Sequence, residues 1–126
     1  MAIDDGTLAH SVDLVARIPP VEMDPQALVD DVVLIAYAYP DEDEFKAAIA
    51  SVCRALSQLV DGRVSGSELQ YNHTGWLSYH FQHRRSQGAK ADMRVVYQKG
   101  HRGIRVRGFG NRRIPTDIYR RLHSGR

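Results

Sequence analysis

Apolar residues recur with helical spacing in the middle of the first half of the chain. They are Leu28, Val32, Ile35 and Tyr39. A spacing of three to four residues places them on one face of a helix. Asp24 and Pro25 come just before, and they suit an N-cap followed by a proline in the first turn. The pattern predicts a helix that runs from Pro25 to Pro40, although the run VVLIAYAY also suits a buried strand.

A second apolar stripe with the same period follows Pro40. It consists of Phe45, Ile49, Val52, Leu56 and Val60. Asp41 and Glu44 have the spacing of a capping box, and the surrounding acidic residues suit the positive end of a helix dipole. The sequence therefore predicts a helix that ends at Asp61-Gly62. The two helices form an antiparallel pair joined by a tight turn, and their solvated faces hold most of the acidic residues.

Alternation of apolar and polar residues predicts strands elsewhere. The segment SVDLVARI, residues 11–18, alternates in this way and predicts a half-buried strand that ends at Pro19-Pro20. Beyond Gly66 the period changes again, and three antiparallel strands joined by hairpins are expected at 75–84, 92–99 and 103–109. The last of these places Ile104 and Val106 on one face, with Arg105, Arg107 and Phe109 on the other.

The segment PTDIYRRLH predicts a short closing helix that begins at Pro115 or Thr116. The expected fold is therefore α+β: an N-terminal strand, an antiparallel helical pair, a three-stranded antiparallel meander and a short C-terminal helix. The helices form a layer on one face of the sheet. A length of 126 residues suits a single domain spanning 1–126.

The two halves of the chain differ strongly in charge. Residues 1–62 carry twelve acids and three bases, a net charge of −9, and residues 63–126 carry three acids and fourteen bases, a net charge of +11. Such a split indicates a polyanionic partner, or two halves that neutralise each other across an internal contact. Aromatic residues are interleaved with the bases. RNA or another single strand is therefore favoured, since bases stack on rings while arginines hold phosphates.

The remaining composition limits the cellular setting. A single cysteine, Cys53, excludes an internal disulfide and suits a reducing compartment. The chain has no run of eighteen apolar residues, and its first ten residues lack the pattern of a signal peptide. We expect a cytoplasmic protein with no membrane contact.

Six arginines fall within residues 104–122, IRVRGFGNRRIPTDIYRRL. We expect the open sheet face to present Arg94, Arg105 and Arg107, joined by Arg112 and Arg113 from the end of the last strand. The planar guanidinium donates two parallel hydrogen bonds to phosphate. Cleavage of RNA without a metal also needs groups that transfer protons. The candidates are Tyr119, His80, His83, His101 and Lys90, and spacing alone selects none of them.

Metal or cofactor chemistry is not expected. His80 and His83 would point to opposite faces of a strand, and no carboxylate or cysteine lies near them in the sequence.

Two short segments resemble a known family. One is Arg94-Val95-Val96-Tyr97, and the other runs from Gly110 through Asn111, Arg112 and Arg113 to Tyr119. They are similar to the strand signature and the closing motif of the RelE/ParE superfamily, the toxins of type II toxin–antitoxin pairs. Asn111 departs from the pattern, because many members carry His or Lys there.

The resemblance implies a ribosome-dependent, metal-independent mRNA endoribonuclease that inhibits translation. Its catalytic residues would be Arg94, Arg112 and Tyr119, and its partners would be a cognate antitoxin protein, mRNA and the ribosome. Further RNA contacts are expected from Arg105, Arg107, Arg113, Lys90 and His101. The alternatives are a ParE-like inhibitor of DNA gyrase without nuclease activity and a non-catalytic module that binds nucleic acid.

Overall fold

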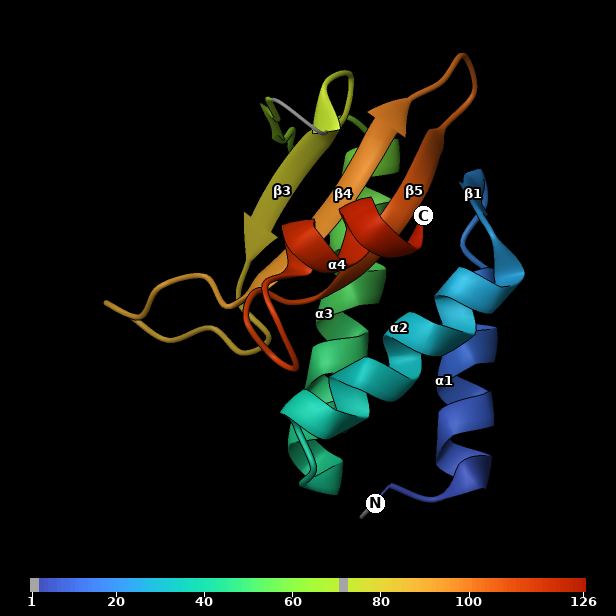
Figure 1. The fold of residues 1–126 in the computed structure, drawn as a ribbon. Coiled ribbons are helices and arrows are strands. Elements are labelled where there is room, and N and C mark those ends of the chain that lie inside the picture. The colour runs from blue at the N-terminus through green and yellow to red at the C-terminus, as the bar shows by residue number, and fades with distance from the viewer. Residues whose placement is uncertain (1–2, 71–72) are drawn as a thin grey trace.

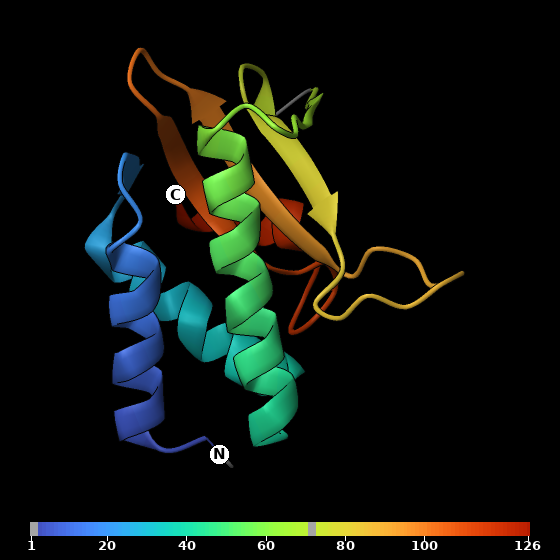
Figure 2. The ribbon, with the colours of Figure 1, turned by 180° about the vertical axis from the view of Figure 1, so that it is seen from behind.

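A mixed five-stranded sheet lies between two helical layers (Figures 1 and 2). The computed structural model describes residues 3–70 and 73–126. Along the chain the elements are α1 (Asp5–Ala16), β1 (Val21–Met23), α2 (Pro25–Ala38), α3 (Glu42–Val60), β2 (Ser67–Glu68), β3 (Leu77–Phe81), β4 (Met93–Lys99), β5 (Ile104–Asn111) and α4 (Ile118–Gly125). Within the described residues, no helix is long and apolar enough to cross a membrane.

The two helices predicted in the first half are confirmed, including their starting points. The Asp24 side chain accepts a hydrogen bond from the backbone N–H of Ala27 at the start of α2, and Pro25 occupies the first turn. Asp41 caps α3 through the backbone N–H of Glu44. The alternative of a strand in VVLIAYAY is wrong, because these residues lie within α2. The predicted apolar stripes of both helices belong to the main core.

The predicted strand at 11–18 is wrong, because this segment lies mostly in helix α1. Asp4 caps the helix by accepting a hydrogen bond from the backbone N–H of Thr7 over 2.7 Å. The buried side of α1 is formed by Leu8, Ser11, Val12 and Val15, a helical spacing. Leu14, which fitted the alternating pattern, is exposed. The alternation within 11–18 was misleading since the helical repeat begins earlier, at Leu8.

The three antiparallel strands predicted in the second half form the centre of a larger sheet. Its strand order is β1-β5-β4-β3-β2. The short strand β1 pairs in parallel with β5, and β2 pairs with β3 at the opposite edge. The meander prediction is therefore incomplete, because these two edge strands are too short to give a periodic signal. Gly103 allows β1 to approach β5, since a Cβ at this position would lie 2.0 Å from the carbonyl oxygen of Pro20.

A β-bulge changes which face Phe109 occupies. Val96 pairs with Gly108 while Tyr97 pairs with Val106, so Arg107 is an extra residue in β5. One extra residue reverses the alternation of side chains beyond it. Phe109 is fully buried in the same core as Ile104 and Val106, and its predicted placement on the arginine face is wrong.

The second face of the sheet is covered by α4 rather than open (Figure 1). Helices α1, α2 and α3 pack on the first face and enclose the main core. On the second face, Ile118 and Leu122 of α4 pack against Val96 of β4 in a smaller apolar cluster. Gly108 makes room for this contact, because a Cβ there would lie 2.3 Å from Leu122 Cδ2. This helix separates the arginines that were expected to share one open surface.

The end of α4 is anchored to α2 by a buried ion pair. Both oxygens of Asp31 accept hydrogen bonds from the guanidinium of Arg126, each over 2.8 Å. Asp31 is 0% exposed and also accepts from the backbone N–H of Phe109 in β5. One carboxylate thus joins α2, β5 and the end of α4.

Candidate functional site

The loop between β5 and α4 is fixed at both ends by backbone hydrogen bonds. The N–H of Arg112 donates to the carbonyl of Asp92, and the N–H of Ile118 donates to the carbonyl of Arg112. Asp117 caps α4 by accepting from the backbone N–H groups of Tyr119 and Arg120. The first turn of α4, which carries Tyr119, therefore has a defined position relative to Arg112.

Strands β3 and β4 bring a histidine to the same place. His80 pairs with Arg94 across the two strands, and Ser78 pairs with Val96. Ser78 and His80 are two residues apart on β3, so both face α4. The hydroxyl of Tyr119 lies 2.8 Å from Ser78 Oγ and 3.3 Å from His80 Nε2, within hydrogen-bond distance of both. We call His80, Arg94, Arg112 and Tyr119 the His80 cluster.

The electrostatic environment keeps His80 neutral at lower pH than an ordinary histidine. Burial and the positive charges of Arg94 and Arg112 lower the pKa of the imidazole from its usual value of 6.5. The residue is nevertheless exposed to solvent. Its Nδ1 has no hydrogen-bond partner within the described part of the chain. An accessible, neutral imidazole beside two guanidinium groups can accept a proton from an anionic ligand.

Arg94 lies beneath the surface of the cluster. It is only 4% exposed, and its Nη1 donates to the carbonyls of Ala91 and Met93, each over 2.9 Å. Its Nε has no hydrogen-bond partner among the described residues, and no carboxylate within 4 Å pairs with the guanidinium there. A buried cation without an anionic partner is costly. Arg94 therefore supplies a positive field at the base of the cluster rather than a direct contact to a ligand.

A polar network lies behind the Arg112 loop. The hydroxyl of Tyr39 donates to Asp92 Oδ2 over 2.5 Å, and the same oxygen lies 2.6 Å from His83 Nδ1. The other ring nitrogen of His83 pairs with Glu44. Burial and the neighbouring Asp92 carboxylate raise the pKa of Tyr39. Burial alone would raise the pKa of Asp92, but hydrogen bonds from Tyr39 and His83 hold it below the usual value.

Asn111 connects this network to the loop. Its Nδ2 donates to the hydroxyl of Tyr39 over 3.0 Å, and its Oδ1 accepts from the backbone N–H groups of Arg113 and Ile114, each over 2.9 Å. Asn111 therefore shapes the turn that carries Arg112. A His or Lys side chain offers no oxygen for these two N–H groups.

The remaining predicted RNA contacts are dispersed. Arg105 pairs with Gln98 and Arg94 with Gly110, toward opposite ends of the antiparallel pair β4–β5. Arg105 and Arg107 do share the sheet face of Arg94, as expected, but they lie toward its other end and line a separate cavity, so the expected convergence is wrong for these two residues. Three further predicted contacts are exposed in loops: Arg113 after β5, Lys90 before β4 and His101 in the β4–β5 hairpin.

The cluster offers acid–base and electrostatic chemistry. Among the described residues, no group of three or more His, Cys, Asp or Glu side chains is arranged to hold a metal ion. Glu44, His83 and Asp92 lie together, but they hydrogen-bond one another directly. The His80 cluster combines a proton acceptor, a phenol and two guanidinium groups, which suits an anion that loses or gains a proton.

The chain was compared with protein-family models, with curated proteins and with solved structures, and none of these matches it.

Sequence reasoning named His80 among five proton-transfer candidates but did not select it. One sequence signal was available: in a strand, residues at even spacing share a face, so Ser78 and His80 had to lie together. Their contact with Tyr119 required the position of α4 on the sheet, which sequence spacing does not supply.

Proposed function

We propose that this protein is a metal-independent endoribonuclease, acting as the toxin of a type II toxin–antitoxin pair of the RelE/ParE type. In this proposal it acts in the cytoplasm on mRNA bound to the ribosome and is inhibited by a cognate antitoxin. The observation that carries the proposal is the contact between His80 Nε2 and the Tyr119 hydroxyl, beside Arg94 and Arg112.

The proposed reaction is attack of the ribose 2′-hydroxyl on the adjacent phosphate. Neutral His80 takes the proton of the 2′-hydroxyl, a role for which a lowered pKa is suitable since the unprotonated form dominates at neutral pH. The new P–O bond gives a 2′,3′-cyclic phosphate, the bond to the 5′-oxygen breaks, and the departing oxygen takes a proton from water or a neighbouring acid.

Arg112 and Arg94 stabilise the charge that develops on the phosphate. Arg112 is partly exposed and within reach of a bound strand, whereas Arg94 acts through its field from beneath. Tyr119 orients the His80 ring, because its hydroxyl also contacts Ser78 and is held by two groups. Loss of one hydrogen-bond donor that stabilises the transition state, such as Arg112, costs about 10²- to 10³-fold in rate. Loss of the general base, His80, costs about 10²- to 10⁴-fold in rate.

The test is induction of the protein in a bacterial culture, with primer-extension mapping of a test mRNA. We expect growth arrest and new codon-phased 5′ ends for the natural sequence, and neither for His80→Ala or Arg112→Ala. The control is Arg102→Ala, which removes an exposed arginine at the far end of the β4–β5 hairpin and keeps both effects. Purified protein should cut the mRNA only when ribosomes are present.

Other outcomes identify the alternatives. Growth arrest without mRNA cuts, together with loss of supercoiling activity, indicates a ParE-like inhibitor of DNA gyrase. No arrest, with RNA affinity that falls steeply as salt increases, indicates a non-catalytic binding module.

A further inference from the structure

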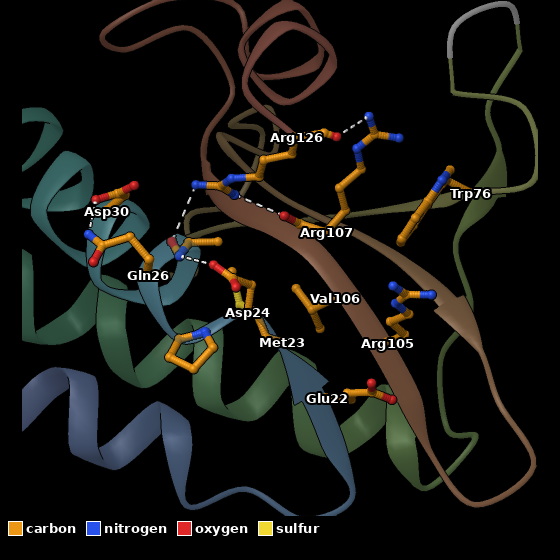
Figure 3. A pocket seen from close by; sticks show the side chains of 12 residues that line it. Glu22, Met23, Asp24, Gln26, Asp30, Trp76, Arg105, Val106, Arg107 and Arg126 are labelled. Atoms are coloured by element: carbon orange, nitrogen blue, oxygen red, sulfur yellow. Dashed lines mark hydrogen bonds between the residues drawn. The ribbon is translucent and has the colours of Figure 1, made fainter.

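A cavity of about 700 Å³ opens between β1, the start of α2 and β5 (Figure 3). None of the four residues of the His80 cluster lines it. Its volume lies within the range of about 300–1,000 Å³ that is typical of sites for small molecules. The cavity also contains Trp76, the only tryptophan of the chain.

One wall of the cavity is aromatic and basic. The guanidinium of Arg107 lies over the ring of Trp76, 5.3 Å from its centroid, and Arg107 Nη2 donates to the backbone oxygen of Arg126 over 3.0 Å. These contacts fix the guanidinium plane. Arg105 is exposed on the same side of the cavity, and it has no hydrogen-bond partner in the part of the chain that the structure describes (Figure 3).

Two carboxylates also line the cavity: Glu22 of β1, the cross-strand neighbour of Arg105, and Asp24 at the start of α2 (Figure 3). Glu22 has no hydrogen-bond partner among the residues described. Asp24 uses Oδ2 to cap α2, which leaves Oδ1 without a partner in the same set of residues. Met23 and Val106 also line the cavity, although Val106 is only 4% exposed and belongs to the main core (Figure 3). The cavity therefore brings carboxylate acceptors, guanidinium groups and an aromatic ring together.

We propose that this cavity binds a guanine nucleotide. The base stacks on the guanidinium of Arg107, which itself lies over the Trp76 ring, and stacking of bases on aromatic and guanidinium planes is common for single-stranded nucleotides. Guanine carries two adjacent N–H donors on its Watson–Crick edge, and the carboxylates of Glu22 and Asp24 accept them. Adenine places an acceptor beside its amino group, which a carboxylate repels. Arg105 holds the phosphate through its guanidinium.

The proposal is independent of the RNA cleavage proposed for the His80 cluster. The nucleotide is either free or part of an RNA strand, since the base and one phosphate are the same in both.

The test uses the fluorescence of Trp76, which lines the cavity and is the only tryptophan of the chain. We expect GMP to change the fluorescence saturably, AMP to bind at least about tenfold more weakly, and inorganic phosphate to leave the signal unchanged. Tighter binding of the dinucleotide GpA, carrying a 5′-phosphate, than of GMP assigns the cavity to RNA. Equal or weaker binding assigns it to the free nucleotide.

Four variants separate the contributions of the carboxylates and the arginine. Glu22→Gln and Asp24→Asn should bring the affinities of GMP and AMP close together, and asparagine preserves the cap of α2. Arg105→Gln should weaken GMP about tenfold and leave guanosine, which lacks the phosphate, unchanged. Arg63→Gln, a change of an exposed arginine outside the cavity, should alter nothing. Equal responses to GMP, AMP and phosphate, or no saturable response to GMP, would overturn the proposal.

Discussion

Substitution of Asp31 by alanine should remove a large part of the stability of this protein. The carboxylate is fully buried and accepts three hydrogen bonds, two from Arg126 and one from the backbone of Phe109. A second guanidinium, that of Arg121, has its Nη2 3.6 Å from Asp31 Oδ1. The carboxylate joins α2, β5 and the end of α4, so its loss affects both layers of the fold.

The magnitude follows from two costs. Removing one partner of a buried ion pair costs about 3–5 kcal/mol, because the other charge stays buried without compensation. Alanine also leaves the Phe109 N–H without an acceptor, at about 1–3 kcal/mol. The side chains of Arg126 and Arg121 are 18% and 15% exposed, so water relieves part of the first cost. We expect a loss of about 4 kcal/mol from a total stability of about 5–15 kcal/mol.

Urea unfolding at pH 7, followed by Trp76 fluorescence and circular dichroism, measures this loss. Asp31→Asn should cost about 1 kcal/mol less than Asp31→Ala, since the amide oxygen still accepts from Phe109. The control is Asp30→Asn on the exposed side of the same helix, with a change within about 0.5 kcal/mol. A loss below about 1 kcal/mol for Asp31→Ala would refute the view that this ion pair anchors α4.

Two further predictions concern protons. The imidazole of His80 should titrate below pH 6.5 when followed by NMR, and Arg112→Gln should raise its pKa. Because the folded state disfavours protonated His80, this residue should lower the free energy of unfolding as the pH falls below 6.5. A measured His80 pKa above 6.5 would contradict the environment that the structure assigns to it. Tyr39→Phe should cost about 1–2 kcal/mol at neutral pH, since Asp92 and Asn111 both lose the hydroxyl as a partner. The pKa of Asp92 is lowered in the folded state, so ionised Asp92 stabilises the fold above pH 3.8, and this stabilisation is lost as the pH falls through the folded-state pKa. The cost of Tyr39→Phe, measured by urea unfolding, should therefore shrink in acid. A cost independent of pH would show that the Tyr39–Asp92 contact is not responsible.

Local signals determined the parts of the fold that depend on neighbouring residues. Helices α2 and α3 were predicted with their caps, because Asp24 and Asp41 act on N–H groups three residues away. The three central strands were also predicted, since strand-forming residues and the hairpin turns between them are signals carried by neighbouring residues. The alternation at 11–18 failed for the same reason, because a short window is compatible with two periods and Leu8 lay outside it.

The tertiary structure decided what depends on residues far apart in the chain. The acidic faces of the helices were expected in solvent, yet Asp31 is buried, because Arg126 lies 95 positions away and supplies its counter-charge. The bulge at Arg107 reversed the face of Phe109, and pairing with β4 created it. The charge of the arginines was readable from the sequence. Their division into a His80 cluster and a separate cavity was not, since it follows from where α4 packs on the sheet.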